Sequence, residues 1–467
     1  MLRTNLSQAG ILPAEPPIPP DPDPPDEVPF PRIAAVQLSG WLNSGVEARL
    51  DRIAQSSWSI LGLWKIWELE GFDLISLVDH IKTQNPDHKV FFYTNPPDAT
   101  PAASEQETFV GNKVSSEAGP NGSPKDDWWL YNAADLNFGF WPENHTGDVD
   151  AAPNESWMIN TSEAVTADTE NTWKYPEWIA NFHYAASTDV GDYVFDGGIS
   201  GDKGIGFKEV SLDGVYTDNQ VSRAFADLDW NGDGSNEIRD SAGVLAKQLA
   251  FYTKYRDVWK GLEPTWLHGG NMSRQGGTDW DVTEGTGWQD LNDFGQFEAM
   301  LGESWSVETW DTWNEMMEWY RRDMSLLNSN KLGMFDQHFT TIPGGIDEFQ
   351  WMRYGLTSCL QDNGYYAAAN PIGETIYGDY KIYDEYGVNL GLAIDIPQTS
   401  AWSLGVYRRE FDNGLVLTNP KDNGPRTVNV GAGYKSFFGA QDSATNNGLN
   451  KSFVTLQERD GIILIRQ

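Results

Sequence analysis

The 467-residue sequence has one cysteine, six histidines and no long apolar run. A single cysteine, Cys359, cannot form a disulfide within the chain, and its helical spacing from Phe349, Met352 and Leu356 predicts a core position. No apolar window of about 18 residues occurs, so we expect no membrane-spanning helix. The first residues lack the apolar segment of a secretory signal, so we expect no signal peptide in this chain.

Basic residues are scarce: 32 lysines and arginines stand against 68 aspartates and glutamates, which gives a net charge of −36. Phosphate-binding surfaces need clustered basic side chains, so this balance argues against a nucleic-acid partner and against a sugar-phosphate lyase or isomerase. The acidic charge balance is more compatible with a neutral ligand or with saline surroundings. The 21 tryptophans are abundant by contrast. We expect most of them in the core, although exposed rings can serve as flat platforms for sugars.

The composition divides the chain into three parts. Residues 1–32 hold ten of the 25 prolines, which predicts an extended arm or linker that can tether the chain to a larger assembly. Residues 33–397 alternate short apolar runs with helical stretches, and a polar, Trp-rich insertion at 98–190 follows the third run. In residues 398–467 the apolar period becomes two, with Asn, Asp and Gly turns, which predicts a small antiparallel β domain.

Eight apolar runs separated by helical patterns favour a closed barrel over an open doubly wound sheet. No GxGxxG fingerprint follows the first run, which argues against a dinucleotide-binding fold. We therefore predict an α/β protein, a (β/α)8 TIM barrel followed by a C-terminal antiparallel β-sandwich. The eight runs are residues 33–41, 57–64, 89–96, 210–219, 264–271, 293–301, 331–339 and 364–370.

Polar side chains end these runs, where TIM barrels carry their active sites. Asp218 ends the fourth strand and Glu298 lies on the sixth, and such a pair can act as nucleophile and general acid on a glycosidic bond. Asp336 on the seventh strand is a reserve carboxylate, and Glu303 lies close enough to compete with Glu298. An acidic residue after a strand is also often a helix N-cap, so that reading stays open. The residues expected to bind substrate are Trp41, Asn95, His268, Asn271, Asp336 and His338.

The stretch DWNGDGSNEIRD, residues 229–240, has the ligand spacing of a calcium loop. Calcium takes roughly six to eight oxygen ligands, and Gly234 stands at position six, where such loops turn sharply. Position twelve is Asp240 instead of Glu, and no clear helix precedes the loop. The alternative is an acidic, glycine-rich surface turn. The predicted ligands of a structural Ca²⁺ are Asp229, Asn231, Asp233, Ser235, Glu237 and Asp240.

Several segments together resemble a family of bacterial and phage-associated glycoside hydrolases, related at a distance to the α-galactosidase and α-amylase superfamily. They include GVYTDN at 214–219, FGQFEAM at 294–300, YDEYGVNLG at 383–391 and the ending from GLVLTNP onward. The resemblance covers residues 33–467 and leaves out the proline-rich arm. It implies that Asp218 is the nucleophile and Glu298 the acid/base.

The sequence therefore predicts a calcium-stabilised, retaining glycoside hydrolase that acts on a polysaccharide or oligosaccharide. The alternative is a non-catalytic carbohydrate-binding or virion-surface component on the same barrel, a context favoured by the proline-rich arm and the missing signal peptide. The two carboxylates separate these hypotheses, because a binding module has no need of both. For either one we expect a carbohydrate ligand and an extracellular or virion-associated location.

Overall fold

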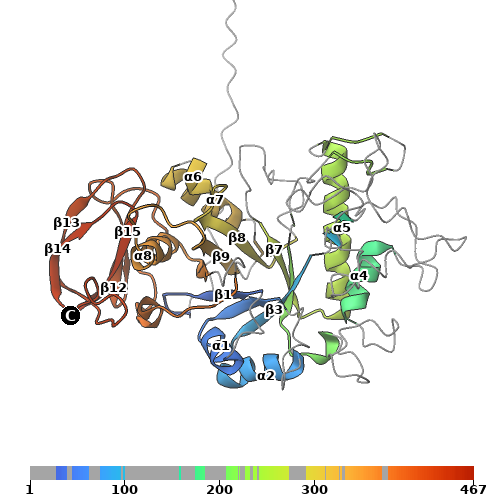
Figure 1. The fold of residues 1–467 in the computed structure, drawn as a ribbon, viewed down its shortest axis with the longest axis horizontal. Helices are drawn as coiled ribbons and strands as arrows, with labels where there is room; N and C mark the ends of the chain where they lie inside the picture. The colour runs from blue at the N-terminus through green and yellow to red at the C-terminus, as the bar shows by residue number, and fades with distance from the viewer. Residues whose placement is uncertain are drawn as a thin grey trace, which may run out of the picture.

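The fold consists of an eight-stranded parallel barrel and a five-stranded antiparallel sheet (Figure 1). No helix in the described part of the chain is both long and apolar enough to cross a membrane. The computed structural model describes residues 28–38, 45–62, 74–95, 98–99, 157–158, 174–184, 207–218, 220, 227–231, 235–238, 241–272, 291–310, 312–325, 327–328, 332–370 and 377–467.

Each barrel strand lies within the apolar run that predicted it. Neighbouring strands pair in parallel. The barrel closes where Ile33 forms a parallel bridge with Tyr366, whose N–H donates to the carbonyl of Arg32 at 2.9 Å. This confirms the predicted (β/α)8 barrel. In order, the strands are β1 (Ala34–Gln37), β2 (Trp58–Leu61), β3 (Lys89–Thr94), β6 (Gly214–Thr217), β7 (Leu267–Asn271), β8 (Phe294–Leu301), β9 (Leu332–His338) and β10 (Tyr365–Ala369).

Aromatic side chains fill the barrel interior. Phe91 and Phe294 stack with ring centroids 3.8 Å apart, and Trp58 meets both edge-on. All three side chains are buried, as is Tyr216 beside them. Because successive strand residues face opposite sides, the next inward positions toward the strand ends are the ones that can carry polar groups above this apolar layer.

The helices cover the outer face of the barrel. Helix α5 shows why they pack there, because Tyr252, Tyr255 and Trp259 lie at helical spacing and are all buried. Helix α8 begins at the N-cap Asp347, whose side chain accepts a hydrogen bond from the N–H of Gln350. The α-helices are α1 (Val46–Ile53), α2 (Leu74–Gln84), α4 (Tyr175–Tyr184), α5 (Ala242–Leu262), α6 (Val307–Trp310), α7 (Trp313–Ser325) and α8 (Glu348–Cys359).

Short elements complete the barrel part. Cys359 at the end of α8 is buried, which confirms its predicted core position. Within the predicted insertion, the structure describes α4 and one strand pair. The short elements are β4 (Asp98–Ala99), β5 (Trp157–Met158) and the 3-10 helices η3 (Phe207–Glu209) and η5 (Asp384–Gly387).

The C-terminal domain is one antiparallel sheet whose central part, at residues 414–419 and 460–464, is buried on both faces. Val416 and Ile463 belong to the large core shared with α8, whereas Leu415 and Leu417 face a separate apolar cluster inside the domain. This confirms the predicted C-terminal β-sandwich; the domain limits given above stay predictions. In sheet order the strands are β11 (Tyr407–Phe411), β12 (Gly414–Asn419), β15 (Asp460–Arg466), β13 (Arg426–Ser436) and β14 (Asn450–Leu456).

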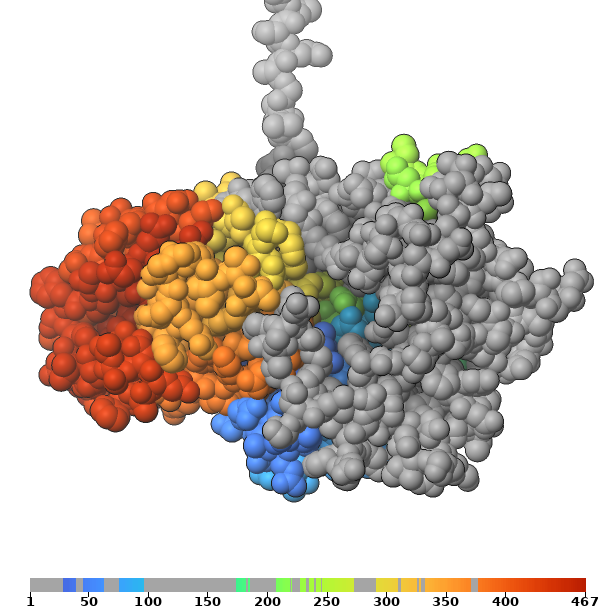
Figure 2. Space-filling view, viewed as in Figure 1, coloured from blue at the N-terminus to red at the C-terminus, as the bar shows by residue number. Residues whose placement is uncertain are grey.

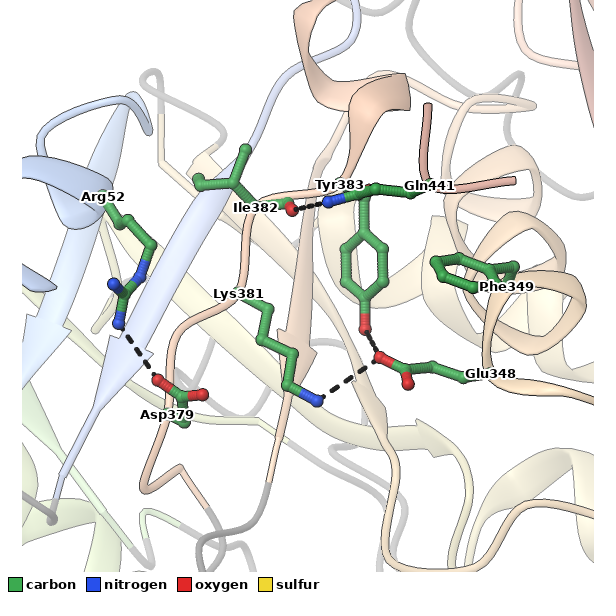
Figure 3. A pocket seen from close by; sticks show the side chains of 8 residues that line it. All are labelled: Arg52, Glu348, Phe349, Asp379, Lys381, Ile382, Tyr383 and Gln441. Carbon is green, nitrogen blue, oxygen red and sulfur yellow. Dashed lines mark hydrogen bonds and ion pairs between the residues drawn. The ribbon is translucent and has the colours of Figure 1, made fainter. Parts of the chain in front are cut away.

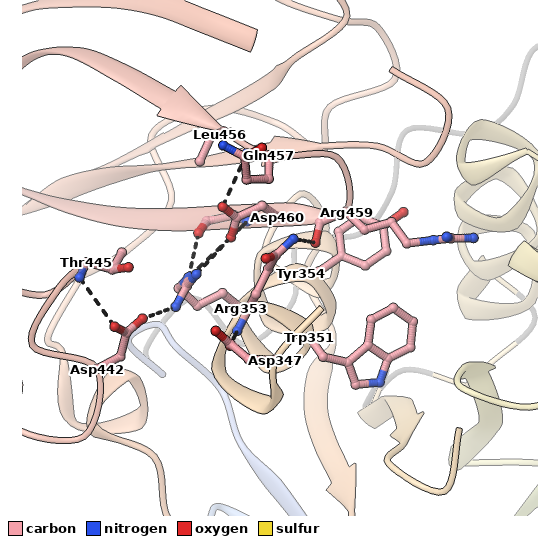
Figure 4. A network of polar contacts seen from close by, with 12 residues as sticks. Asp347, Trp351, Arg353, Tyr354, Asp442, Thr445, Leu456, Gln457, Arg459 and Asp460 are labelled. Carbon is pink, nitrogen blue, oxygen red and sulfur yellow. Dashed lines mark hydrogen bonds and ion pairs between the residues drawn. The ribbon is translucent and has the colours of Figure 1, made fainter. Parts of the chain in front are cut away.

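Arginine–carboxylate pairs fasten this domain to the barrel helices. Arg353 on α8 binds Asp460 at 3.1 Å and also Asp442, both from the C-terminal domain (Figure 4). Arg459 donates two hydrogen bonds to Glu308 on α6, at 2.8 and 3.1 Å. We call Arg353, Asp442, Asp460, Arg459 and Glu308 the junction network. In the space-filling view the C-terminal domain and the neighbouring barrel residues form one continuous body (Figure 2).

Residues 377–391, here called the closing segment, lie over the seam between β10 and β1. They contain a 3-10 helix but no α-helix. Gln37 on β1 donates to the carbonyls of Tyr377 and Gly378 at 3.2 and 3.0 Å. At the far end Phe30 and Gly391 form an antiparallel bridge. The closing segment therefore joins the rim of the barrel to its base.

Candidate active site

One amide holds the two predicted catalytic carboxylates. Asn271, the last residue of β7, donates from Nδ2 to Oδ1 of Asp218 at 3.0 Å and to Oε2 of Glu298 at 2.8 Å. Asp218 directly follows β6, and Glu298 lies on β8, so the amide comes from the strand between them. The structure therefore brings together three residues that the sequence singled out.

The inward alternation of the strands explains this meeting. On β8, Phe294 fills the barrel interior, and Gln296 and Glu298 follow it at successive inward positions. On β6, Tyr216 is interior and Asp218 comes two residues later. The polar groups therefore sit one step above the aromatic layer, at the carboxyl ends of the strands.

Tyr93 completes the surroundings of Asp218. Its hydroxyl donates to Oδ2 of Asp218, so both carboxylate oxygens accept a hydrogen bond. The sequence did not identify Tyr93, although it lies two positions after the interior Phe91 on β3 and could have been found by the same alternation.

Tyr377 connects Glu298 with the reserve carboxylate Asp336. Its hydroxyl lies 3.3 Å from Oε1 of Glu298 and donates to Oδ2 of Asp336. Gln296 donates to the same Asp336 oxygen at 2.7 Å and to the Tyr377 hydroxyl at 2.8 Å. Tyr377 belongs to the closing segment, outside any strand pattern, so the sequence offered no signal for it.

Burial and like charge act on Glu298. Burial first, and then the neighbouring carboxylates of Asp218 and Asp336, raise its pKa to about 7 against the opposing effects of His338 and the amide of Asn271. A carboxyl group with such a pKa can hold a proton near neutral pH. Asp218 is a carboxylate like Glu298, but its surroundings differ, because both of its oxygens accept a hydrogen bond.

His338 and Glu303 form an ion pair next to Tyr377. The ring nitrogens of His338 lie 2.9 Å from Oε1 of Glu303 and 2.9 Å from the hydroxyl of Tyr377. Burial alone would lower the pKa of His338, but the carboxylates of Asp336 and Glu303 outweigh it and raise the pKa to about 10. His338 is therefore a cation at neutral pH, and its bond holds the pKa of Glu303 below the usual range. Glu303 is thus the ion-pair partner of His338.

An irregularity in β8 directly follows Glu298. The pairing with β9 shifts register between Phe297 and Leu301, and Ala299 has a positive φ of 48°. Gly302 has φ 101°, and a Cβ there would meet the carbonyl oxygen of His338 at 2.1 Å. Bulges of this kind often re-aim side chains beside active sites, and here the bulge turns the chain just after the carboxylate.

His268, another predicted substrate ligand, does not face these carboxylates. His268 is buried against Tyr255 of α5, with its Nδ1 3.2 Å from the carbonyl of Leu291, and burial lowers its pKa to about 4. Its ring thus lies on the helix side of β7. Asn95 is half-buried just beyond β3, and Trp41 lies outside the described residues.

The calcium loop is described in part. Asp229, Asn231, Ser235 and Glu237 are described, whereas Asp233 and Asp240 lie outside the described residues. Glu237 accepts hydrogen bonds from Lys247 at 2.8 Å and from the N–H of Trp230 at 2.7 Å. Within the described ranges, no three His, Cys, Asp or Glu side chains form a metal-binding group.

Comparison with known proteins supports the fold. No protein-family model matches the chain, and no curated protein matches its sequence. Amy13B of Eubacterium rectale superposes with a TM-score of 0.50 at 7% identity, over 93% of this chain and 96% of that one. The GH36 α-galactosidase AgaA of Geobacillus stearothermophilus gives 0.41 at 10% identity, over 93% of this chain and 55% of that chain.

A family GH13_31 enzyme gives a TM-score of 0.47 at 9% identity, over 93% of this chain and 99% of that one. This chain spans about half the length of the α-galactosidase. At such identities the likeness shows the barrel fold. The relationship to glycoside hydrolases and the bacterial or phage-associated family described above stay predictions.

Proposed function

We propose that the chain is a retaining glycoside hydrolase with Asp218 as nucleophile and Glu298 as acid/base. The observation that carries this is the shared amide of Asn271. Its two hydrogen bonds of 3.0 and 2.8 Å limit the bound oxygens to a separation of about 6 Å, close to the roughly 5–5.5 Å of retaining enzymes and short of the roughly 6.5–9.5 Å of inverting ones.

In the first step Asp218 attacks the anomeric carbon. The bond to the leaving oxygen breaks as Glu298 gives that oxygen its proton, and a glycosyl ester with Asp218 forms. The hydrogen bonds from Tyr93 and Asn271 leave the attacking carboxylate fixed in orientation. In the second step ionised Glu298 takes a proton from water, which attacks the anomeric carbon and releases Asp218.

The hydrogen bonding of Asp336 supports a role for this residue in holding the sugar. Its Oδ2 binds Tyr377 and Gln296, whereas its buried Oδ1 makes no hydrogen bond with any described residue. A buried carboxylate oxygen of this kind calls for a donor, and a substrate hydroxyl would supply one. His338, fixed between Glu303 and Tyr377, holds this carboxylate in place by its positive charge.

The test uses Asp218→Asn and Glu298→Gln against glycosides with poor and with activated leaving groups. Asp218→Asn should abolish hydrolysis of both kinds, by about a thousandfold or more, since no ester can form. Glu298→Gln should lose the poor substrates but recover the first step on activated ones, because these need no proton. Asp257→Asn, an exposed carboxylate on α5, is the control and should retain full activity.

Full activity in both site variants would refute the assignment. A wild-type chain that binds glycans but cleaves none in a broad hydrolysis screen would favour the alternative, a non-catalytic carbohydrate-binding or virion-surface component. The pH dependence adds an independent check. Because the proton donor has a raised pKa of about 7, kcat/KM should fall as pH rises through 7.

A polysaccharide substrate agrees with an extracellular or virion-associated location, which we propose together with tethering through residues 1–32. Neutral glycans also agree with the net charge of −36, since such a surface repels anionic polymers. Co-purification of the chain with a larger particle, lost on deletion of residues 1–27, would support the tether; unchanged co-purification would refute it. Phe30 and Arg32 are kept because they pack against the barrel.

A further inference from the structure

A cavity of about 350 Å³ lies beside the closing segment, and none of the three site carboxylates lines it (Figure 3). Four parts of the fold meet there: α1, the start of α8, the closing segment and a loop of the C-terminal domain. Its size suits a small ligand or one unit of a larger one. The lining residues are Arg52, Glu348, Phe349, Asp379, Lys381, Ile382, Tyr383 and Gln441.

One wall of the cavity is aromatic and held in place. Phe349 meets Tyr383 edge to face, with ring centroids 6.3 Å apart. The hydroxyl of Tyr383 donates to Glu348 at 2.7 Å, and Gln441 donates to the carbonyl of Ile382 at 3.0 Å. Tyr383 is buried by these contacts, whereas Phe349 is half-buried. The exposed part of Phe349 therefore presents a fixed apolar surface to the cavity.

The charges around the cavity are balanced. Arg52 pairs with Asp379 at 3.1 Å, and Lys381 pairs with Glu348 at 3.4 Å. Two cations and two anions leave the lining neutral, which disfavours a phosphate or another strongly charged ligand. A neutral ligand meets no such mismatch.

The polar groups retain capacity for further hydrogen bonds. Asp379 binds Arg52 through Oδ1, and Glu348 is bound through Oε1. Their second oxygens, and Nη1 of Arg52, make no hydrogen bond with any described residue. Carboxylate acceptors and a guanidinium donor beside an aromatic surface match the hydroxyls and apolar face of a sugar ring.

We propose that this cavity is a second carbohydrate-binding site, which takes a neutral mono- or disaccharide unit of a polysaccharide away from the cleaving carboxylates. The choice of polysaccharide as the ligand rests on the proposed function. The binding itself does not need Asp218 or Glu298 to be catalytic. The cavity then lets the barrel hold a long substrate at two points, which raises the effective concentration of the chain being cleaved.

The test is affinity electrophoresis in native gels that contain glycogen, pullulan, galactomannan or laminarin. The full-length Glu298→Gln variant is used, so the polysaccharide stays intact during the run. Adding Phe349→Ala should weaken the retention by at least one polysaccharide about threefold to tenfold, as expected for loss of one aromatic contact. Adding Lys381→Ala, at an exposed position, should weaken the same retention without risk to the core.

Phe453→Ala is the matched control, because Phe453 is an aromatic side chain 64% exposed on β14 and does not line the cavity. Its retention should equal that of the parent. Equal retention of all variants, or retention of none by any polysaccharide, would overturn the second site. Retention that depends on Phe349, together with a wild-type protein that hydrolyses nothing, would keep the second site and refute the proposed function. Hydrolysis by the wild-type protein without such dependence would do the reverse.

Discussion

Two groups of carboxylates have opposite surroundings: Asp460 and Glu308 of the junction network are buried, and the pair at the rim of the barrel is half-buried. In the junction network, Asp460 and Glu308 each face an arginine. At the rim of the barrel, Asp218 and Glu298 share one neutral amide. The first arrangement compensates charge and fastens two parts of the fold. The second leaves like charges close together, which costs stability but raises the pKa of one carboxyl into the range useful for proton transfer.

Breaking the junction network should give the largest loss of stability. Arg353→Leu leaves Asp460 and Asp442 without their guanidinium partner, and removing one partner of a buried ion pair costs about 3–5 kcal/mol of unfolding free energy. Urea denaturation would measure this. The control is Arg256→Leu, since its pair with the exposed Asp257 should be worth less than about 1 kcal/mol. Similar losses in both variants would mean that the junction contributes no more than the surface does.

A substitution at the rim of the barrel should change the unfolding free energy in the opposite direction. Burial and like charge raise the pKa of Glu298 from 4.5 to about 7, so the folded state loses stability as pH rises from 4.5 through 7. Glu298→Gln should therefore stabilise the protein by about 1–3 kcal/mol at pH 8 and change little at pH 4.5. Thermal unfolding at the two pH values measures the difference. A stabilisation of the same size at both would show that charge is not the cause.

Glu303→Gln is the natural partner of that experiment. The bond to His338 lowers the pKa of Glu303, so its charge stabilises the fold above the ordinary carboxyl range and the benefit is lost as pH falls. Its replacement should destabilise the protein at pH 8 and matter less in acid. Opposite effects of Glu298→Gln and Glu303→Gln would distinguish the proposed proton donor, Glu298, from Glu303, the counter-ion of His338.

Calcium should have the smallest effect. If the loop of residues 229–240 binds one ion, free Ca²⁺ at ten times Kd stabilises the folded state by about 1.4 kcal/mol. The melting temperature should drop with chelator and recover with calcium but not with magnesium. Asp233→Asn should abolish the recovery. An unchanged melting temperature would mean that the loop binds no calcium and that Glu237 serves as a hydrogen-bond partner of Lys247 and Trp230.

Periodicity predicted the barrel because each of its strands is apolar and bounded by polar residues. Asp218 and Glu298 were predicted from their place at the ends of the strands, and both extend an interior row of their strand by one step. The same criterion failed for His268, because the alternation of side chains along β7 turns its ring toward the helix layer. Tyr377 could not be predicted, because its place depends on how the closing segment crosses the seam, which is decided by contacts with distant residues such as Gln37.

The closure of the barrel sets the order of assembly during synthesis. Arg32 donates to the carbonyl of Asn363, 331 positions further along the chain, so the first strand waits for its second neighbour until most of the protein has been made. Long sequence separation slows folding, and unpaired strand edges invite aggregation in the meantime. A nascent chain halted before β10 would expose β1 and β9 as open edges. The last barrel strand is therefore the element that turns an aggregation-prone intermediate into a closed barrel.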